Sequence, residues 1–321
     1  MTIQRLQLCA LSLFLLLGVP AQAAPAPSES HTTEAQEDSS PPEVAWRAPQ
    51  HRVFYRSVTG LGSNPAGLGN TLDVGYRYRL FDSDSILTRD SFAGLGLSSM
   101  ITPTFGQVGV SAQVQPLAVL FLEARWKHTS WFGNLGHVQT YSDAEADFSD
   151  DAVAAQGDTD ESFATTSWEA DLIAELRAKI GPVVLRNRTL FMRTELTPPK
   201  RPDDTLYYDP IYDLLMPTSG WSSTNSADIL LMLRDDRLIL GVRHTSNNSY
   251  RDDSGSDVPH HRVGPIMAYR FSIQPGARFD APTVLAMVQW HTKHRYRAGQ
   301  VLPYVLIAFA FQGDLLSTLP P

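Results

Sequence analysis

The sequence predicts an all-β fold, a transmembrane antiparallel β-barrel of about twelve strands, and three observations predict it. Residues 166–180 alternate apolar and ionic side chains with a period of two, as a β-strand does. Eleven further stretches show the same kind of period, with differing clarity. A secretory signal at the start sends the chain out of the cytoplasm, and short and long connections alternate between the strands.

The signal occupies residues 1–24. Arg5 gives the positive start, Leu6 to Val19 is an apolar run of 14 residues, and Ala21-Gln22-Ala23 gives the cleavage pattern of a Sec substrate. The apolar run is too short for a spanning helix. We expect residues 25–50, rich in Pro, Ser, Glu and Ala, to be a disordered periplasmic linker. The barrel should then span 51–313, with 314–321 as a C-terminal tail.

Cysteine content and net charge exclude some classes of ligand and partner. The only cysteine, Cys9, lies in the signal, so the mature chain has no thiol, disulfide or thiolate metal site. A net charge of −8 argues against a nucleic-acid partner. Outer-membrane lipids and the barrel assembly machinery are the expected partners, although Phe311 is followed by a tail where such barrels often end on an aromatic residue. The sequence leaves the oligomeric state open.

Twelve strands are expected. In the clear case of 70–81, Leu72, Val74 and Tyr76 alternate with Asp73 and Arg77. In order, the strands are 51–59, 70–81, 92–102, 107–115, 118–131, 166–180, 183–195, 222–234, 237–247, 261–274, 282–297 and 303–313.

The connections predict the orientation. Outer-membrane barrels have short periplasmic turns and longer outer loops. Placing the tight turns inside puts every long loop outside and both termini in the periplasm. The turns are 115–117, 181–182 and 235–236, and the long polar loops are 132–165, 196–221 and 248–260.

Aromatic residues near strand ends fit a membrane belt, but a soluble β-protein would place the same residues in its core. These residues are Tyr76, Tyr78, Trp126, Trp131, Trp168, Trp221, Trp290 and Tyr304.

The face opposite the apolar one is strongly charged, with sixteen basic residues against six acidic ones by our assignment. Two interpretations stay open: a closed, ion-paired interior, or a narrow, water-filled pore biased toward anions. The expected lumen-lining residues include Arg77, Arg79, Arg125, Lys127, Glu169, Asp171, Glu175, Arg177, Arg186, Arg188, Arg270, Lys293 and Arg295.

The loop 132–165 is acidic and contains neither Lys nor Arg. We favour a solvated, flexible surface loop over a divalent-cation site, because its acids lack the spacing of a calcium loop. A binding or adhesion function through this loop, at 133–165, is one hypothesis.

One motif could carry chemistry. His244 and Ser246 share the lipid-facing side at the outer end of a strand, so a base and a nucleophile could meet there. The string His-x-Ser-Asn at 244–247 resembles the catalytic segment of outer-membrane phospholipase A and of the lipid A deacylases. The resemblance covers about fifteen of 321 residues.

That resemblance implies a lipid ester hydrolase with His244 as base and Ser246 as nucleophile. Asp257 would orient the histidine, and Asp252 and Asp253 could help to bind calcium, which the phospholipase family uses. Apart from that calcium, no cofactor is expected. The leading hypothesis remains a barrel without chemistry, either a narrow pore or a structural, surface-exposed protein.

The histidine pairs do not predict a metal site. His260 and His261 should point to opposite faces of one strand, and His291 and His294, three residues apart, should do the same.

Overall fold

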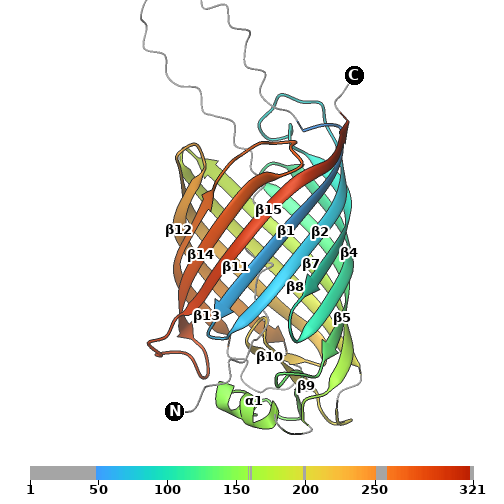
Figure 1. Cartoon of the computed structure of the whole chain (residues 1–321), viewed down its shortest axis with the longest axis vertical. Coiled ribbons are helices and arrows are strands. Elements are labelled where there is room, and N and C mark those ends of the chain that lie inside the picture. The colour runs from blue at the N-terminus through green and yellow to red at the C-terminus, as the bar shows by residue number, and fades with distance from the viewer. Residues whose placement is uncertain (1–47, 158, 160, 198–199, 251–258, 319–321) are drawn as a thin grey trace, which may run out of the picture.

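A closed barrel of antiparallel strands makes up most of the computed structural model, which describes residues 48–157, 159, 161–197, 200–250 and 259–318 (Figure 1). Within those residues twelve strands form the wall, and each strand pairs with its neighbour in the chain. The wall strands are β1 (His51–Ser63), β2 (Gly67–Arg79), β3 (Phe92–Ile101), β4 (Phe105–Leu117), β5 (Leu120–Phe132), β7 (Ala164–Ile180), β8 (Val183–Thr197), β11 (Ser219–Leu233), β12 (Leu238–Tyr250), β13 (His260–Arg270), β14 (Asp280–Lys293) and β15 (Tyr304–Thr318).

The first and last strands close the ring. β1 pairs with β2 on one side and with β15 on the other, in a register that runs from His51 opposite Thr318 to Ser63 opposite Val305. β15 continues to Thr318, so 314–318 belong to the wall and not to the expected tail. A specific contact explains the extension, because Arg52 Nε donates to Asp314 Oδ1 at 2.6 Å.

The apolar residues of the alternating pattern point to the outside of the barrel, and the charged ones point to its interior. Along β7, Leu172 is 55% exposed while its neighbour Asp171 is 2% exposed. Large apolar side chains are exposed on the outer face of the other strands as well, such as Leu97, Val110, Ile229 and Ile307. Apolar side chains outside and charged ones inside are the arrangement of a membrane-spanning barrel. The predicted fold class is therefore confirmed.

The two ends of the barrel differ. The tight turns after β4, β7 and β11 lie at the same end as the start of β1 and the end of β15. The connections after β5, β8 and β14 lie at the opposite end (Figure 1). Among the described residues, no helix is long and apolar enough to cross a membrane.

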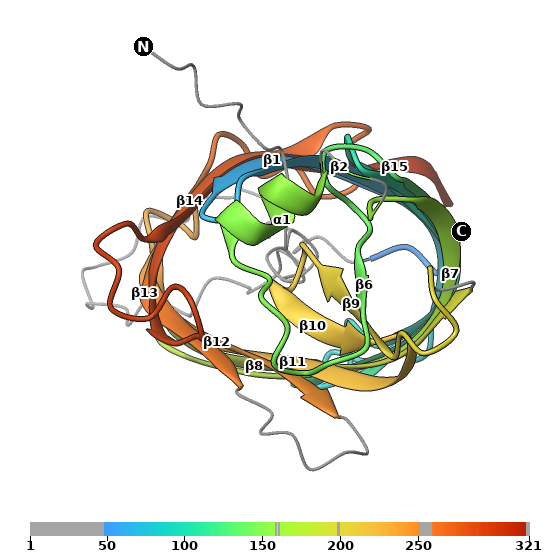
Figure 2. The same cartoon turned by 90° about the horizontal axis from the view of Figure 1, so that it is seen from below.

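The connections at that opposite end fold into a cap. β6 (Thr140–Tyr141), β9 (Leu206–Asp209) and β10 (Leu214–Pro217) form a three-stranded sheet in the order β10-β9-β6. Figure 2 shows this sheet and helix α1 (Asp150–Gly157) lying across the mouth of the barrel. We define the cap as the described residues of 133–163, 200–218 and 294–303.

Apolar contacts hold the cap in the mouth. Tyr207 and Met216 of the cap sheet share a buried cluster with Phe105, Trp131 and Met192, which point inward from the wall. Each such side chain contributes roughly 1.5–3 kcal/mol when fully buried. The expectation of a solvated, flexible loop at 132–165 is therefore wrong for its described residues, because this loop supplies β6 and α1.

Candidate functional site

The barrel interior is crossed by ion pairs between neighbouring strands. Asp228 of β11 lies between two arginines, with Arg186 Nε 2.7 Å from Oδ2 and Arg243 Nε 2.6 Å from Oδ1. Lys127 bridges Glu169 and Asp171, and its Nζ atom lies 2.8 Å from Asp171 Oδ2. The three residues of the Asp228 group are all 3% exposed or less. Water has little access to these charges, so the closed, ion-paired arrangement is the one that the structure adopts here.

Some inward cations have aromatic neighbours in place of acids. The Arg77 guanidinium lies 4.0 Å from the ring centre of Phe54 and 4.2 Å from that of Phe92, and it also donates to Gln113. Arg262 lies 4.2 Å from the ring centre of Tyr304. Cation–π contacts of this kind offset part of the cost of burying a charge, but they add no negative charge. The described interior therefore keeps an excess of positive charge.

Most of the expected lumen-lining residues point inward. They are Arg77, Arg79, Arg125, Lys127, Glu169, Asp171, Glu175, Arg177, Arg186, Arg188 and Arg270.

Lys293 and Arg295 do not line the lumen as expected. The β13–β14 pairing is irregular between His261 and Arg262, so Lys293 lies opposite the outward-facing His261 and is itself exposed. β14 ends at Lys293, and strand alternation therefore does not apply to Arg295. Arg295 instead lies in the cap, where Nη2 is 3.1 Å from Glu145 Oε2.

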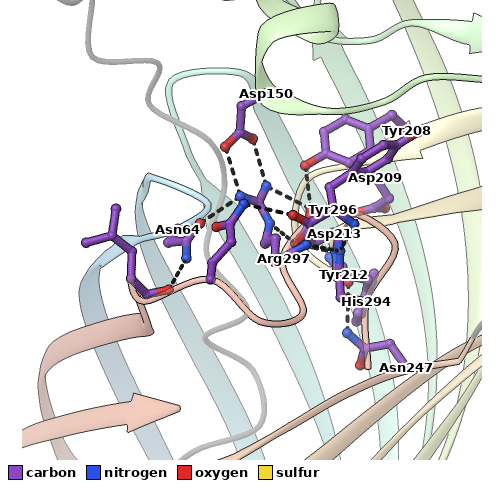
Figure 3. Close-up of polar contacts among 12 residues, drawn as sticks. Asn64, Asp150, Tyr208, Asp209, Tyr212, Asp213, Asn247, His294, Tyr296 and Arg297 are labelled. Atoms are coloured by element: carbon purple, nitrogen blue, oxygen red, sulfur yellow. Dashed lines mark hydrogen bonds and ion pairs between the residues drawn. The ribbon is translucent and has the colours of Figure 1, made fainter. Parts of the chain in front are cut away.

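Arg297 is the polar centre of the cap (Figure 3). Its Nε and Nη2 atoms donate to Asp213 at 2.5 and 3.1 Å, and Nη1 and Nη2 donate to Asp150 at 2.8 and 2.7 Å. Nη1 also donates to Asn64 in the β1–β2 turn at 2.7 Å. Asp213 accepts a further hydrogen bond from the Tyr208 hydroxyl. One guanidinium thus ties together the helix, the β9–β10 turn and the barrel rim.

Two buried acids of the cap, Asp209 at the end of β9 and Asp213 in the β9–β10 turn, differ in how readily they ionise. Burial raises the pKa of Asp209 to about 6, and hydrogen bonds from the Ile211 and Tyr212 amides only partly oppose this effect. Burial also acts against the charge of Asp213, but Arg297 and His294 outweigh it and hold the pKa of that carboxyl well below its usual range. Asp213 is therefore a fixed anion, while Asp209 titrates in a mildly acidic range.

A small, tightly lined cavity lies between the cap and the wall. It is lined by Tyr212, Asp213, Asn247, His260, His261, Arg262, His291 and His294. The expectation that His291 and His294 face apart is wrong. β14 ends at Lys293, and His294 turns inward until its ring centre is 5.0 Å from that of His291. His260 lies against the same ring, at 3.9 Å.

These residues are a poor metal site, although one ligand atom from each of Asp213, His291 and His294 lies within 4.8 Å of the others. His294 Nδ1 accepts from the backbone amides of Tyr296 and Arg297, so the neutral ring carries its proton on Nε2, the atom that faces Asp213. Asp213 already accepts from Arg297 and Tyr208. Neither group offers a metal an unused lone pair without losing existing bonds.

The predicted hydrolytic residues lie where the sequence places them, on the outer face near the capped end of β12. His244 Nε2 lies 3.2 Å from Nδ1 of His261 on β13, and Ser246 is the residue directly opposite His261. Asn248 donates to Ser246 Oγ at 3.3 Å. Among the described side chains, His244 and Ser246 make no hydrogen bond to each other. Asp257, Asp252 and Asp253 lie outside the described residues.

Sequence reasoning missed the Asp213–Arg297 centre of the cap. The run Leu214-Leu215-Met216 interrupts an otherwise polar loop, and this was a local sign of a buried hairpin. Strand periodicity could not show that Arg297 reaches this hairpin, because the residue lies in a connection.

The fold and the cap define a class, a membrane-spanning β-barrel with a charged interior and one covered mouth. No protein-family model matches the sequence, and no curated protein has a similar sequence. OccAB1 of Acinetobacter baumannii is 12% identical, with a TM-score of 0.38 over 77% of this chain, which spans only 58% of that protein.

Two further solved structures match more of their own length. The KdgM porin is 8% identical, with a TM-score of 0.37 over 82% of this chain and 100% of the porin. The Acinetobacter baumannii outer membrane protein Omp33 is 8% identical, with a TM-score of 0.39 over 83% and 100%. Similarity at this level describes a barrel wall and carries no argument about transport or chemistry.

Proposed function

We propose that this protein is an outer-membrane β-barrel with a narrow, anion-biased lumen that the cap holds closed. One observation carries the proposal: the barrel interior has more arginine than carboxylate side chains, and the folded cap covers the mouth of this interior. A basic lumen lowers the energy of an anion in transit and raises that of a cation. The ion pairs and the cap together obstruct the lumen, so passage requires the cap to loosen and the interior side chains to move aside.

The orientation belongs to the same proposal. We place the capped mouth at the cell surface and both termini in the periplasm, because longer connections are typical of the outer side. Protease added to intact cells should then cut within the cap and leave an epitope tag fused to the C-terminus untouched. A cut tag and an intact cap would reverse the orientation.

Conductance across a planar lipid bilayer tests the pore. The wild-type barrel should conduct rarely, and Arg297→Gln should open more often because the cap loses its polar centre. In a salt gradient the reversal potential should show anion preference. Arg201→Gln is the matched control, since this cap side chain is 56% exposed, its partner Glu161 is 33% exposed, and exposed pairs contribute little.

The outcomes separate cleanly. Cation preference would refute the basic-lumen argument. Silence from a correctly folded Arg297→Gln barrel would refute the pore itself and leave a structural protein.

A lipid ester hydrolase is the second candidate, favoured by His244, Ser246 and His261 sharing the outward face of β12 and β13 near the capped end. In this mechanism Ser246 attacks the ester carbonyl as His244 takes its proton, the alcohol leaves with that proton, and water releases the acyl group. His261 would orient His244, a role that the resemblance gives to Asp257.

Release of fatty acid from phospholipid or lipid A, with calcium present, tests this candidate. Activity should vanish in Ser246→Ala and persist in Ser249→Ala, which alters an inward-facing serine of the same strand. Equal activity in both variants, or none in the wild type, would remove the hydrolase.

A further inference from the structure

Arg262 is a buried cation that forms no ion pair among the residues that the structure describes. It is 5% exposed, and among the described residues it makes no hydrogen bond and no ion pair. Its Nε atom is enclosed and unsatisfied, and its guanidinium lies over the Tyr304 ring. A buried guanidinium offers five donors, and leaving them without acceptors is costly.

The neighbouring side chains share this deficit. Both ring nitrogens of His291 and the Nδ1 atom of His260 are buried with no hydrogen-bond partner. These rings are 8% and 5% exposed, and they line the same cavity as Arg262. Such groups are normally satisfied by protein, water or a ligand. Their convergence on one cavity points to a ligand.

Charge decides which ligand. Asp213 is the only carboxylate among the described residues that line the cavity, and it is already held by Arg297 and by the Tyr208 hydroxyl. Among the described side chains, the groups that remain for a ligand are the Arg262 guanidinium, imidazole nitrogens that can donate, and one acceptor, Asn247 Oδ1. A metal cation would meet Arg262 as a like charge and would find no available carboxylate, whereas an anion accepts from the donors and supplies the missing negative charge.

We propose that this cavity binds a small inorganic anion, a halide or phosphate, with Arg262 as the main ligand and His291 as the second. Asn247 of the wall donates to the Tyr212 carbonyl of the cap at 2.8 Å, so the cavity is bounded by the cap on one side and by the wall on the other. A bound anion would contact both, and its binding would stabilise the capped form. The site does not depend on the barrel conducting ions.

Thermal unfolding of the full-length refolded barrel tests the site. The unfolding midpoint is measured from the change in gel mobility between the folded and the heat-unfolded barrel. Sodium bromide or sodium phosphate is titrated against sodium gluconate at constant ionic strength, because gluconate is a much larger anion than either. The midpoint should rise saturably in the wild type. Arg262→Gln should weaken binding about tenfold or more, the loss expected for one charged hydrogen bond. Arg270→Gln, on the same face of β13 at its other end, should bind as the wild type does.

A second readout does not depend on variants folding. Crystals of the wild type soaked in bromide should show anomalous scattering within hydrogen-bonding distance of the Arg262 guanidinium. Should Arg262→Gln fail to fold, His291→Gln takes its place in the titration. Stabilisation by zinc without any by bromide or phosphate would overturn the proposal in favour of a metal site. Identical responses to bromide, phosphate and gluconate would overturn it altogether.

Discussion

Arg297 holds the carboxylate of Asp213 through two of its nitrogens, across 84 positions of the chain. The contact joins the β14–β15 connection to the β9–β10 turn, and the other side of the same guanidinium binds Asp150 at the start of α1. Three separate loops therefore depend on one side chain, which makes the cap a cooperative unit.

Arg297→Gln should loosen the cap while the wall stays folded. Asp213 would remain buried with its charge largely uncompensated, at a cost of about 3–5 kcal/mol. Backbone amides of β9 and β10 should exchange with deuterium about 10²–10⁴ times faster, while those of β7 stay protected. Arg201→Gln, which removes an exposed ion pair of the cap, should change neither rate. A uniform loss of protection through the wall would contradict a separate cap.

Asp209→Asn should stabilise the cap in a pH-dependent way. The unfolded chain ionises Asp209 near pH 4, but the folded cap keeps it protonated to about pH 6. The native state therefore binds the extra proton in that window, and wild-type stability falls as the pH rises through it. The variant, which cannot ionise, should match the wild type at pH 4 and exceed it by about 3 kcal/mol above pH 6. Exchange protection of β9 at several pH values measures this difference, and a pH-independent gap would disprove it.

Asp228→Asn should destabilise the barrel wall. It leaves Arg186 and Arg243 buried without their shared anion, which costs about 3–5 kcal/mol. The urea midpoint in lipid vesicles reports the loss. Asp236→Asn removes the partner of Lys179 in an ion pair that is more exposed than those of Asp228, and it should cost about 0–1 kcal/mol. Equal losses in the two variants would mean that water reaches the interior charges.

Leu172→Arg tests whether the apolar outer face of the wall lies in lipid. Leu172 lies midway along β7 on the outer face, where a cation at the centre of the bilayer costs about 2–4 kcal/mol. Ile180→Arg, at the end of the same strand, should cost about 0–1 kcal/mol. The two variants are compared in the same vesicles. Similar values at both positions would indicate that water surrounds the wall.

Much of the wall was predictable from the sequence, because each strand follows one physical rule. Adjacent residues such as Asp171 and Leu172 point to opposite faces of a strand, so one is apolar and the other charged. This period therefore predicts both the strand and its two faces. The prediction failed where the rule stops. Lys293 lies beyond an irregular pairing and Arg295 beyond the strand end, and alternation assigns neither of them.

The cap was beyond such reasoning for a different reason. Its stability comes from contacts between loops far apart in the chain, such as Tyr207 against Trp131 and Arg297 against Asp150. No local period encodes these contacts. The acids of 132–165 appeared solvated because the arginines that meet them belong to other loops.

The pairing of β1 with β15 has a consequence for how the protein is made. The first strand reaches its final partner only after the ribosome has finished the last one, so a nascent chain cannot complete its wall. A product of a premature stop codon would expose two rows of backbone amides and carbonyls, which a bilayer cannot satisfy. Such fragments should fail to insert into the membrane and be degraded. Biosynthesis of this fold is therefore all or nothing.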